Sequence, residues 1–124
     1  MTETTKWLSA ANALLGLWLI VAPFIYSTTS AGLWNDVIVG ALVASIGAYN
    51  YYLTTKGKEV SATGAGANTL LGLWMIAAPF VLGVSGAAFW SDLAVGVLVA
   101  SFAGYNAYVS RRGPDAQARA DHAA

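Results

Sequence analysis

The chain has 124 residues, the length of one small domain, and 57% of them are hydrophobic while only 10% are charged. Soluble domains carry roughly 25% charged residues, so this composition nearly excludes a soluble monomer. Six Lys and Arg balance six Asp and Glu, so the chain lacks the excess of positive charge that nucleic-acid binding requires. It contains no cysteine, which excludes disulfides and thiolate metal sites.

Four segments of membrane-spanning length follow one another along the chain. They are residues 7–26, 34–54, 64–83 and 90–110. Each is close to the roughly 20 residues that a helix needs to cross a bilayer. The alternating apolar and polar pattern of barrel strands is absent from the sequence, so helices are expected. The sequence therefore predicts an all-α integral membrane protein with four transmembrane helices.

Polar stretches divide these segments into two helical hairpins. The first hairpin is expected to occupy residues 1–54, and the linker 55–63 connects it to the second hairpin at 64–110. Glycine and proline stop the last helix, so residues 111–124 are predicted to form a mobile tail.

All six basic residues fall on one side of this arrangement. They are Lys6, Lys56, Lys58, Arg111, Arg112 and Arg119. The loops on the opposite side contain no Lys or Arg, and the positive-inside rule then places both termini in the cytoplasm. The sequence therefore predicts a multi-pass protein of a prokaryotic plasma membrane, N-in and C-in.

The second hairpin repeats the sequence of the first at a constant offset of 56 residues. NALLGLWLIVAPF returns as NTLLGLWMIAAPF, VGALVASIGAYNYY returns as VGVLVASFAGYNAY, and 22 of the 41 positions from 12 to 52 are identical to their counterparts. Each unit contains two spans, so both units have the same orientation in the membrane. A tandem parallel repeat about an axis along the membrane normal is predicted.

The hairpin GLWxIxAPF, followed by W-x-D and VGxLVAS, resembles the SPW repeat, a two-helix membrane module usually found in pairs. The resemblance covers nearly all of residues 7–108 and implies a fold rather than an activity. The tripeptide Ser-Pro-Trp that names the family corresponds here to Ala22-Pro23-Phe24 and Ala78-Pro79-Phe80. The proline and an aromatic ring are kept in both copies, whereas a hydroxyl and an indole N–H are lost.

Asp36 and Asp92 are the only acidic residues near the predicted spans, and each follows a tryptophan by two positions. In the predicted helices they lie in the first turn, where a carboxylate stabilises the positive helix end by about 0.3–1 kcal/mol. We therefore expect two helix caps. Acidic residues in membranes also mark proton and ion pathways, so the alternative is a proton or cation site.

Each hairpin holds two asparagines at similar depth near its predicted cytoplasmic end, Asn12 with Asn50 and Asn68 with Asn106. Amide contacts that set the register between the two helices of a hairpin are expected, at about 0.6 to 2 kcal/mol each. The alternative is a polar pocket for a ligand or an ion.

Small residues recur at intervals of four on the second helix of each hairpin. They are Gly40, Ala44 and Ala48 in the first hairpin and Gly96, Ala100 and Gly104 in the second. Small faces let helix backbones approach closely. These lines are expected to form helix-packing contacts and to support an oligomer or a larger membrane complex.

The sequence contains no recognisable catalytic constellation. The one histidine, His122, lies in the predicted tail, and there is no metal-ligating cluster, Ser/His/Asp set or phosphate-binding glycine loop. We expect a non-enzymatic membrane scaffold or accessory subunit without a cofactor, whose partners are the lipid bilayer and further copies of itself or another membrane protein. The alternatives are a small oligomeric channel or transporter using Asp36 and Asp92, and a lipid- or quinone-binding protein in which Trp18 and Trp74 stack on the ligand.

The predicted topology places residues 27–33 and 55–63 on opposite sides of the membrane. A single cysteine introduced as Thr28→Cys should react with a membrane-impermeant maleimide added to intact cells, whereas Lys58→Cys should react only after permeabilisation. The natural chain has no cysteine, so each variant reports one position. Labelling of both loops from the same side would contradict the four-helix topology.

Overall fold

Four long helices make up the described part of the chain. The computed structural model describes residues 3–25 and 28–112, and its helices are α1 (Glu3–Ile25), α2 (Ser30–Thr55), α3 (Ala62–Leu82) and α4 (Gly86–Arg112). Each is long and apolar enough to cross a membrane. This confirms the predicted class, an all-α protein with four helices of transmembrane length.

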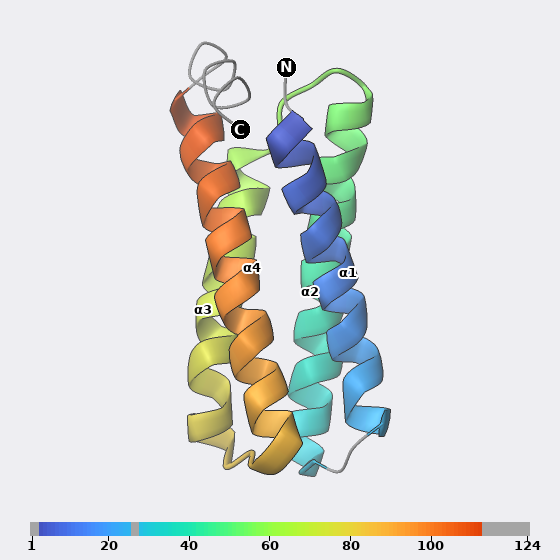
Figure 1. Ribbon diagram of the computed structural model, residues 1–124, viewed down its shortest axis with the longest axis vertical. Coiled ribbons are helices and arrows are strands. Elements are labelled where there is room, and N and C mark those ends of the chain that lie inside the picture. Colours follow the sequence, from blue (N-terminus) through green and yellow to red (C-terminus); the bar gives the residue numbers. More distant parts are fainter. Residues whose placement is uncertain (1–2, 26–27, 113–124) are drawn as a thin grey trace.

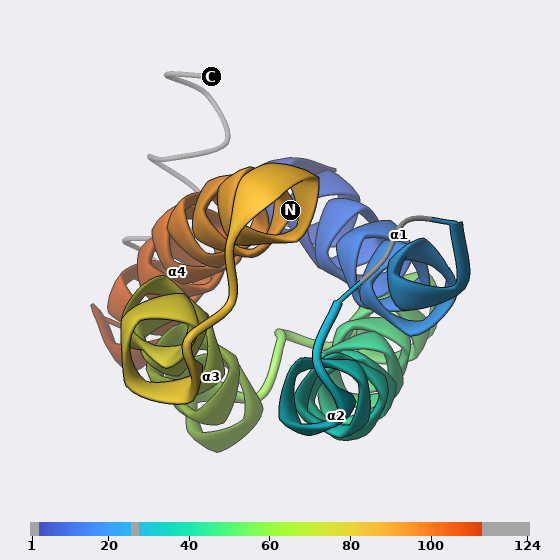
Figure 2. The ribbon, with the colours of Figure 1, turned by 90° about the horizontal axis from the view of Figure 1, so that it is seen from below.

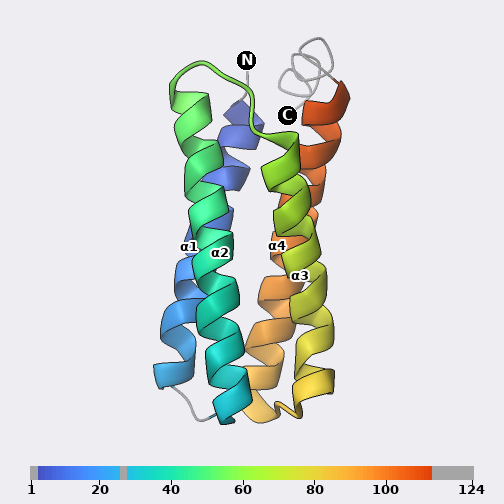
Figure 3. The same cartoon turned by 180° about the vertical axis from the view of Figure 1, so that it is seen from behind.

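The helices lie side by side as a bundle (Figure 1). Viewed along the bundle they form a ring in the order α1, α2, α3, α4 (Figure 2). α1 packs mainly on α2 and α3 mainly on α4, while α1 with α4 and α2 with α3 form less extensive contacts. The link from α2 to α3 lies at the end of the bundle where α1 begins and α4 ends (Figure 3). Lys6, Lys56 and Lys58 therefore lie at one end.

The second helix of each hairpin begins about one turn earlier than predicted. α2 starts at Ser30 and α4 at Gly86, in each case four residues before the expected start. Thr29 is the N-cap of α2, and its hydroxyl accepts a hydrogen bond from the N–H of Gly32 at 2.9 Å. A threonine cap accepts a hydrogen bond from one of the free N–H groups of the first turn. The helix can therefore begin before Trp34, the start that the sequence predicts.

α1 also begins four residues before its expected start, at Glu3, whereas the remaining helix ends lie close to their predicted positions. α3 ends at Leu82, and Gly83 follows with a φ of +70° and donates its N–H to the carbonyl of Pro79. Only glycine adopts this left-handed conformation without a steric cost. α4 continues to Arg112, so the predicted tail at 111–124 begins inside the helix, and from residue 113 onward it lies outside the described residues.

The core between the two hairpins is formed by residues that lie 56 positions apart in sequence. The buried pairs are Leu19 with Met75, Val39 with Val95 and Val43 with Val99. Many other large apolar side chains are exposed, among them Leu14, Leu17, Val21, Ile38, Leu42, Leu70, Leu73, Val81, Val97 and Leu98. An exterior of this kind suits contact with lipid tails rather than with water.

Within each hairpin the helix backbones approach at small residues. A Cβ built on Gly16 of α1 would lie 2.6 Å from the carbonyl oxygen of Gly40 in α2, and a Cβ on Gly40 would lie 2.6 Å from the carbonyl oxygen of Gly16. Gly72 of α3 meets Gly96 and Ala100 of α4 in the same way. The predicted packing residues found at these contacts are Gly40, Ala44, Gly96 and Ala100.

Ala48 and Gly104 do not continue these lines of contact. In the first hairpin Gly47 takes the next position, where an added Cβ would lie 2.7 Å from the backbone nitrogen of Ala13. An α-helix repeats every 3.6 residues, so a line drawn at intervals of four gradually leaves the interface. Gly40, Ala44, Gly96 and Ala100 therefore pack against the other helix of their own hairpin.

Adding one methyl group at the closest contact should destabilise the bundle. We expect Gly16→Ala and Gly72→Ala to lower the free energy of unfolding by about 1–3 kcal/mol, because backbone atoms of the facing helix have to move. Unfolding of the purified chain in bicelles by added SDS measures this change. Gly66→Ala is the matched control, since an added Cβ there has no neighbour within 4 Å. Equal stability of the Gly16 and Gly66 variants would contradict this close packing.

Candidate functional site

Asp36 and Asp92 lie inside their helices and not at the helix ends. Because α2 begins at Ser30 and α4 at Gly86, both carboxyls lie well beyond the first turn, and neither first turn contains an acidic residue. Each aspartate is only 1% exposed. The predicted role as helix caps is therefore wrong, since the N-cap of α2 is Thr29.

The two aspartates, one from each hairpin, meet in the interior of the bundle. The side chains of Asp36 and Asp92 lie close to each other. The amide of Asn35 also donates to Oδ1 of Asp36 at 3.4 Å. An ionised carboxylate can only accept hydrogen bonds, so a bond between two carboxyls requires a proton on one of them. The structure thus brings two acidic side chains together in the interior, one from each hairpin.

Two tryptophan side chains connect the hairpins at the level of this pair. The indole N–H of Trp18 in α1 donates to the hydroxyl of Ser91 in α4 at 2.9 Å, and the indole of Trp74 in α3 donates to Oδ1 of Asn35 in α2 at 2.7 Å. The donors lie 56 residues apart in sequence, and so do the acceptors. Together with the aspartates they form a polar layer that involves all four helices.

Asn35 and Ser91 were missed as candidate residues. They occupy the middle position of W-x-D in the two copies, and their identities differ. The sequence does contain a sign of their role, because the middle position of W-x-D is polar in both copies although most of the neighbouring residues are apolar. Trp18 and Trp74 were considered as ligand-stacking residues, whereas the structure uses the indole N–H of each to hold the other hairpin.

The candidate asparagines make their hydrogen bonds between the hairpins. Asn106 of α4 donates to the hydroxyl of Ser9 at 3.1 Å and to the carbonyl of Thr5 at 3.3 Å, both in α1. Asn68 of α3 donates to the carbonyl of Val43 in α2 at 3.4 Å. The amide contacts expected within one hairpin are replaced by contacts across hairpins, because closely packed small residues fill the interface inside each hairpin.

Of the two remaining asparagines, Asn50 also bonds outside its own hairpin. Asn50 of α2 accepts a hydrogen bond at 2.9 Å from the N–H of Ser61, the N-cap of α3. Asn12 is buried in α1. Among the described residues, four buried side-chain oxygens have no hydrogen-bond donor, namely Oδ1 of Asn12, Asn68, Asp92 and Asn106. Buried polar atoms of this kind usually bind water or another ligand, or else store strain.

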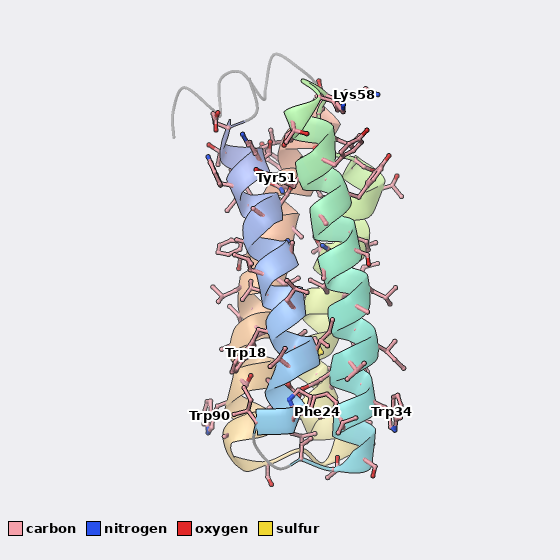
Figure 4. All side chains as sticks on the ribbon, turned by 90° about the vertical axis from the view of Figure 1, so that its right-hand side faces the viewer. Trp18, Phe24, Trp34, Tyr51, Lys58 and Trp90 are labelled. Atoms are coloured by element: carbon pink, nitrogen blue, oxygen red, sulfur yellow. The ribbon has the colours of Figure 1, made fainter. Side chains whose placement is uncertain are left out.

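The proline and the aromatic ring of the APF motif point in different directions. Pro23 and Pro79 are buried, whereas Phe24 is 70% exposed and Phe80 is 68% exposed. Figure 4 shows Phe24, Trp34 and Trp90 near the end of the bundle opposite Lys58, with both tryptophans projecting outward. The phenylalanine rings therefore face the surroundings of the bundle and not the carboxyl pair.

Comparison with known proteins identifies the family. The family model for the SPW repeat domain matches residues 6–106, which is most of the chain. No curated protein and no solved structure matches the sequence. The matched region includes all six residues of the polar layer and both pairs of asparagines.

The hydrogen bond between Trp74 and Asn35 should contribute to stability. We expect a double-mutant cycle of Trp74→Phe and Asn35→Ala to give a coupling energy of about 0.6 kcal/mol and at most about 1.7 kcal/mol, as for other interhelical hydrogen bonds in membranes. Unfolding in bicelles gives the four free energies. Trp34→Phe is the control for loss of an indole, because that ring is exposed. A coupling energy of zero would contradict the bond.

Proposed function

Because this chain belongs to the SPW repeat family and has four helices able to span a membrane, we propose that it is a multi-pass protein of a prokaryotic plasma membrane with both termini in the cytoplasm. The grouping of Lys6, Lys56 and Lys58 at one end of the bundle supports this orientation. We also infer that the hairpins are tandem parallel repeats about an axis along the bundle. Core pairs and cross-hairpin bonds that follow an offset of 56 residues support this relation.

We propose that the protein is a non-catalytic scaffold or accessory subunit of the membrane. The observation that carries this proposal is the use of its interior for packing. Small residues close each hairpin, apolar pairs fill the space between the hairpins, and the polar layer connects all four helices. The described residues contain no group of three or more potential metal-ligating side chains. An interior filled in this way suits a rigid structural protein better than an enzyme with an active-site cavity.

The outer surface is then the part of the protein that meets a partner. Because the small faces are occupied within each hairpin, a second copy or another membrane protein would contact the large apolar side chains on the outside of the helices. Close packing of such side chains is a main source of affinity between helices in lipid.

The accessory proposal predicts an assembly larger than one chain. Extraction of the full chain from its native membrane into polymer nanodiscs avoids detergent, and light scattering then gives the protein mass in each particle. We expect a defined protein mass well above the 12.9 kDa of a single chain. A uniform population of single chains, with no other protein in stoichiometric amount, would overturn the proposal.

The buried carboxyl pair favours a second candidate function, a proton or cation pathway. Ionisable groups inside membrane-spanning segments commonly serve in proton relays. Asp36 and Asp92 lie within the spans, and Oδ1 of Asp92 lacks a hydrogen-bond donor. In an oligomeric channel or transporter this pair would bind and release a proton or a cation during transport.

Flux through liposomes separates the two candidate functions. If the protein is a scaffold, proteoliposomes containing it should acidify no faster than empty liposomes when a pH gradient is applied, as read by an internal pH-sensitive dye. A flux that disappears in Asp36→Asn and in Asp92→Asn would instead establish the pathway. Asparagine keeps the shape and can still donate a hydrogen bond to the remaining carboxyl, so both variants should stay folded. Trp34→Phe serves as a surface control for purification and reconstitution.

A further inference from the structure

An apolar groove opens on the outside of the first hairpin, between α1 and α2. It has a volume of about 290 Å³ and is lined by Trp7, Ala10, Ala13, Leu14, Ala48 and Tyr51. Figure 4 shows Tyr51 between the two helices, towards the end that carries Lys58. The groove therefore lies near one predicted membrane surface, on a face of the bundle that is otherwise covered by apolar side chains.

The groove exists because small residues line its floor. Gly47 and Ala13 bring the two backbones into close contact, and the short side chains of Ala10 and Ala48 leave the space above this contact unfilled. The larger side chains of Trp7, Leu14 and Tyr51 complete the lining, so the groove accommodates an apolar group.

A positive charge is held at the upper edge of the groove. The ammonium of Lys6 lies 5.3 Å from the ring centroid of Trp7 and 5.7 Å from that of Tyr51. These two rings line the groove and are 6.4 Å apart, and the indole N–H of Trp7 donates to the carboxylate of Glu3 at 3.0 Å. Cation–π contacts and the bond to Glu3 hold the mouth of the groove in one arrangement.

We propose that this groove binds a phospholipid, with one acyl chain lying along Ala10, Ala13 and Ala48 and the phosphodiester paired with Lys6. The apolar part faces lipid tails, while the ammonium lies at the end of the bundle, where headgroups are expected. Tryptophan, tyrosine and lysine are the side chains that usually occupy this boundary. Basic residues there attract anionic headgroups. This inference goes beyond the scaffold function, since it assigns a ligand to a place outside the polar layer.

The second hairpin lacks the features that define this site. The positions equivalent to Lys6, Trp7 and Tyr51 are Ala62, Thr63 and Ala107. Those positions carry neither a positive charge nor an aromatic ring. The second hairpin therefore serves as an internal control. Its two helices also face lipid, but they lack the counterparts of Lys6, Trp7 and Tyr51.

Native mass spectrometry of the full chain in detergent, with phosphatidylglycerol added, tests the proposal. We expect the wild-type protein to retain one phospholipid and Ala10→Leu, which fills the groove, to lose it. Gly66→Leu adds the same side chain at the equivalent position of the second hairpin, where an added Cβ has no neighbour within 4 Å, and should retain the lipid. Equal loss of lipid in the two leucine variants would overturn the proposal.

The role of Lys6 is tested separately. Lys6→Ala should weaken phosphatidylglycerol binding about fivefold, the usual effect of one basic residue at an anionic membrane surface, while Lys6→Arg should keep most of the affinity. Thermal unfolding checks that both variants are folded, which is expected for a side chain at the surface. Unchanged affinity in Lys6→Ala, or binding of uncharged diacylglycerol as tight as that of phosphatidylglycerol, would overturn the pairing of the phosphate with Lys6.

Discussion

Close approach of helix backbones at glycine is the constraint on which the bundle depends. Lipid tails are as apolar as leucine, so the hydrophobic effect does not draw helices together in a membrane, and close packing has to do so. Gly16 against Gly40 and Gly72 against Gly96 bring the backbones of each hairpin into direct contact. Little space remains inside a hairpin, so larger side chains lie between the hairpins or on the outside.

The polar groups of the bundle therefore connect the two hairpins. A buried polar group costs free energy unless it finds a partner, and here the partner lies mostly on the other hairpin. Trp18 reaches Ser91, Trp74 reaches Asn35, and the two aspartates meet between them. Separation of the hairpins would leave these groups unpaired in an apolar environment. The pair of hairpins is consequently the stable unit, which agrees with a repeat that occurs twice in one chain.

The two hairpins differ in sequence where packing does not constrain them. The residues that close each hairpin and those of the core keep the same chemistry in both copies. At the groove, Lys6, Trp7 and Tyr51 have no charged or aromatic counterpart in the second hairpin. The two copies therefore differ on the surface that faces lipid, where a substitution does not disturb the helix contacts. A difference that is free of packing constraints is a natural place for a function specific to one copy.

The sequence by itself determined the class of protein, the number of helices, the repeated pattern and four of the six residues predicted for close packing, because composition and helical periodicity are local properties. It set the depth of each residue along a helix but not the direction in which that residue points. That direction depends on the side from which the second hairpin docks, and only the tertiary structure decided it. Docking brought Asp36 and Asp92 together, turned Phe24 outward and directed the asparagines across the hairpins. A helix that begins at Trp34 would make Asp36 a cap, whereas the N-cap Thr29 starts α2 one turn earlier and leaves Asp36 inside the helix.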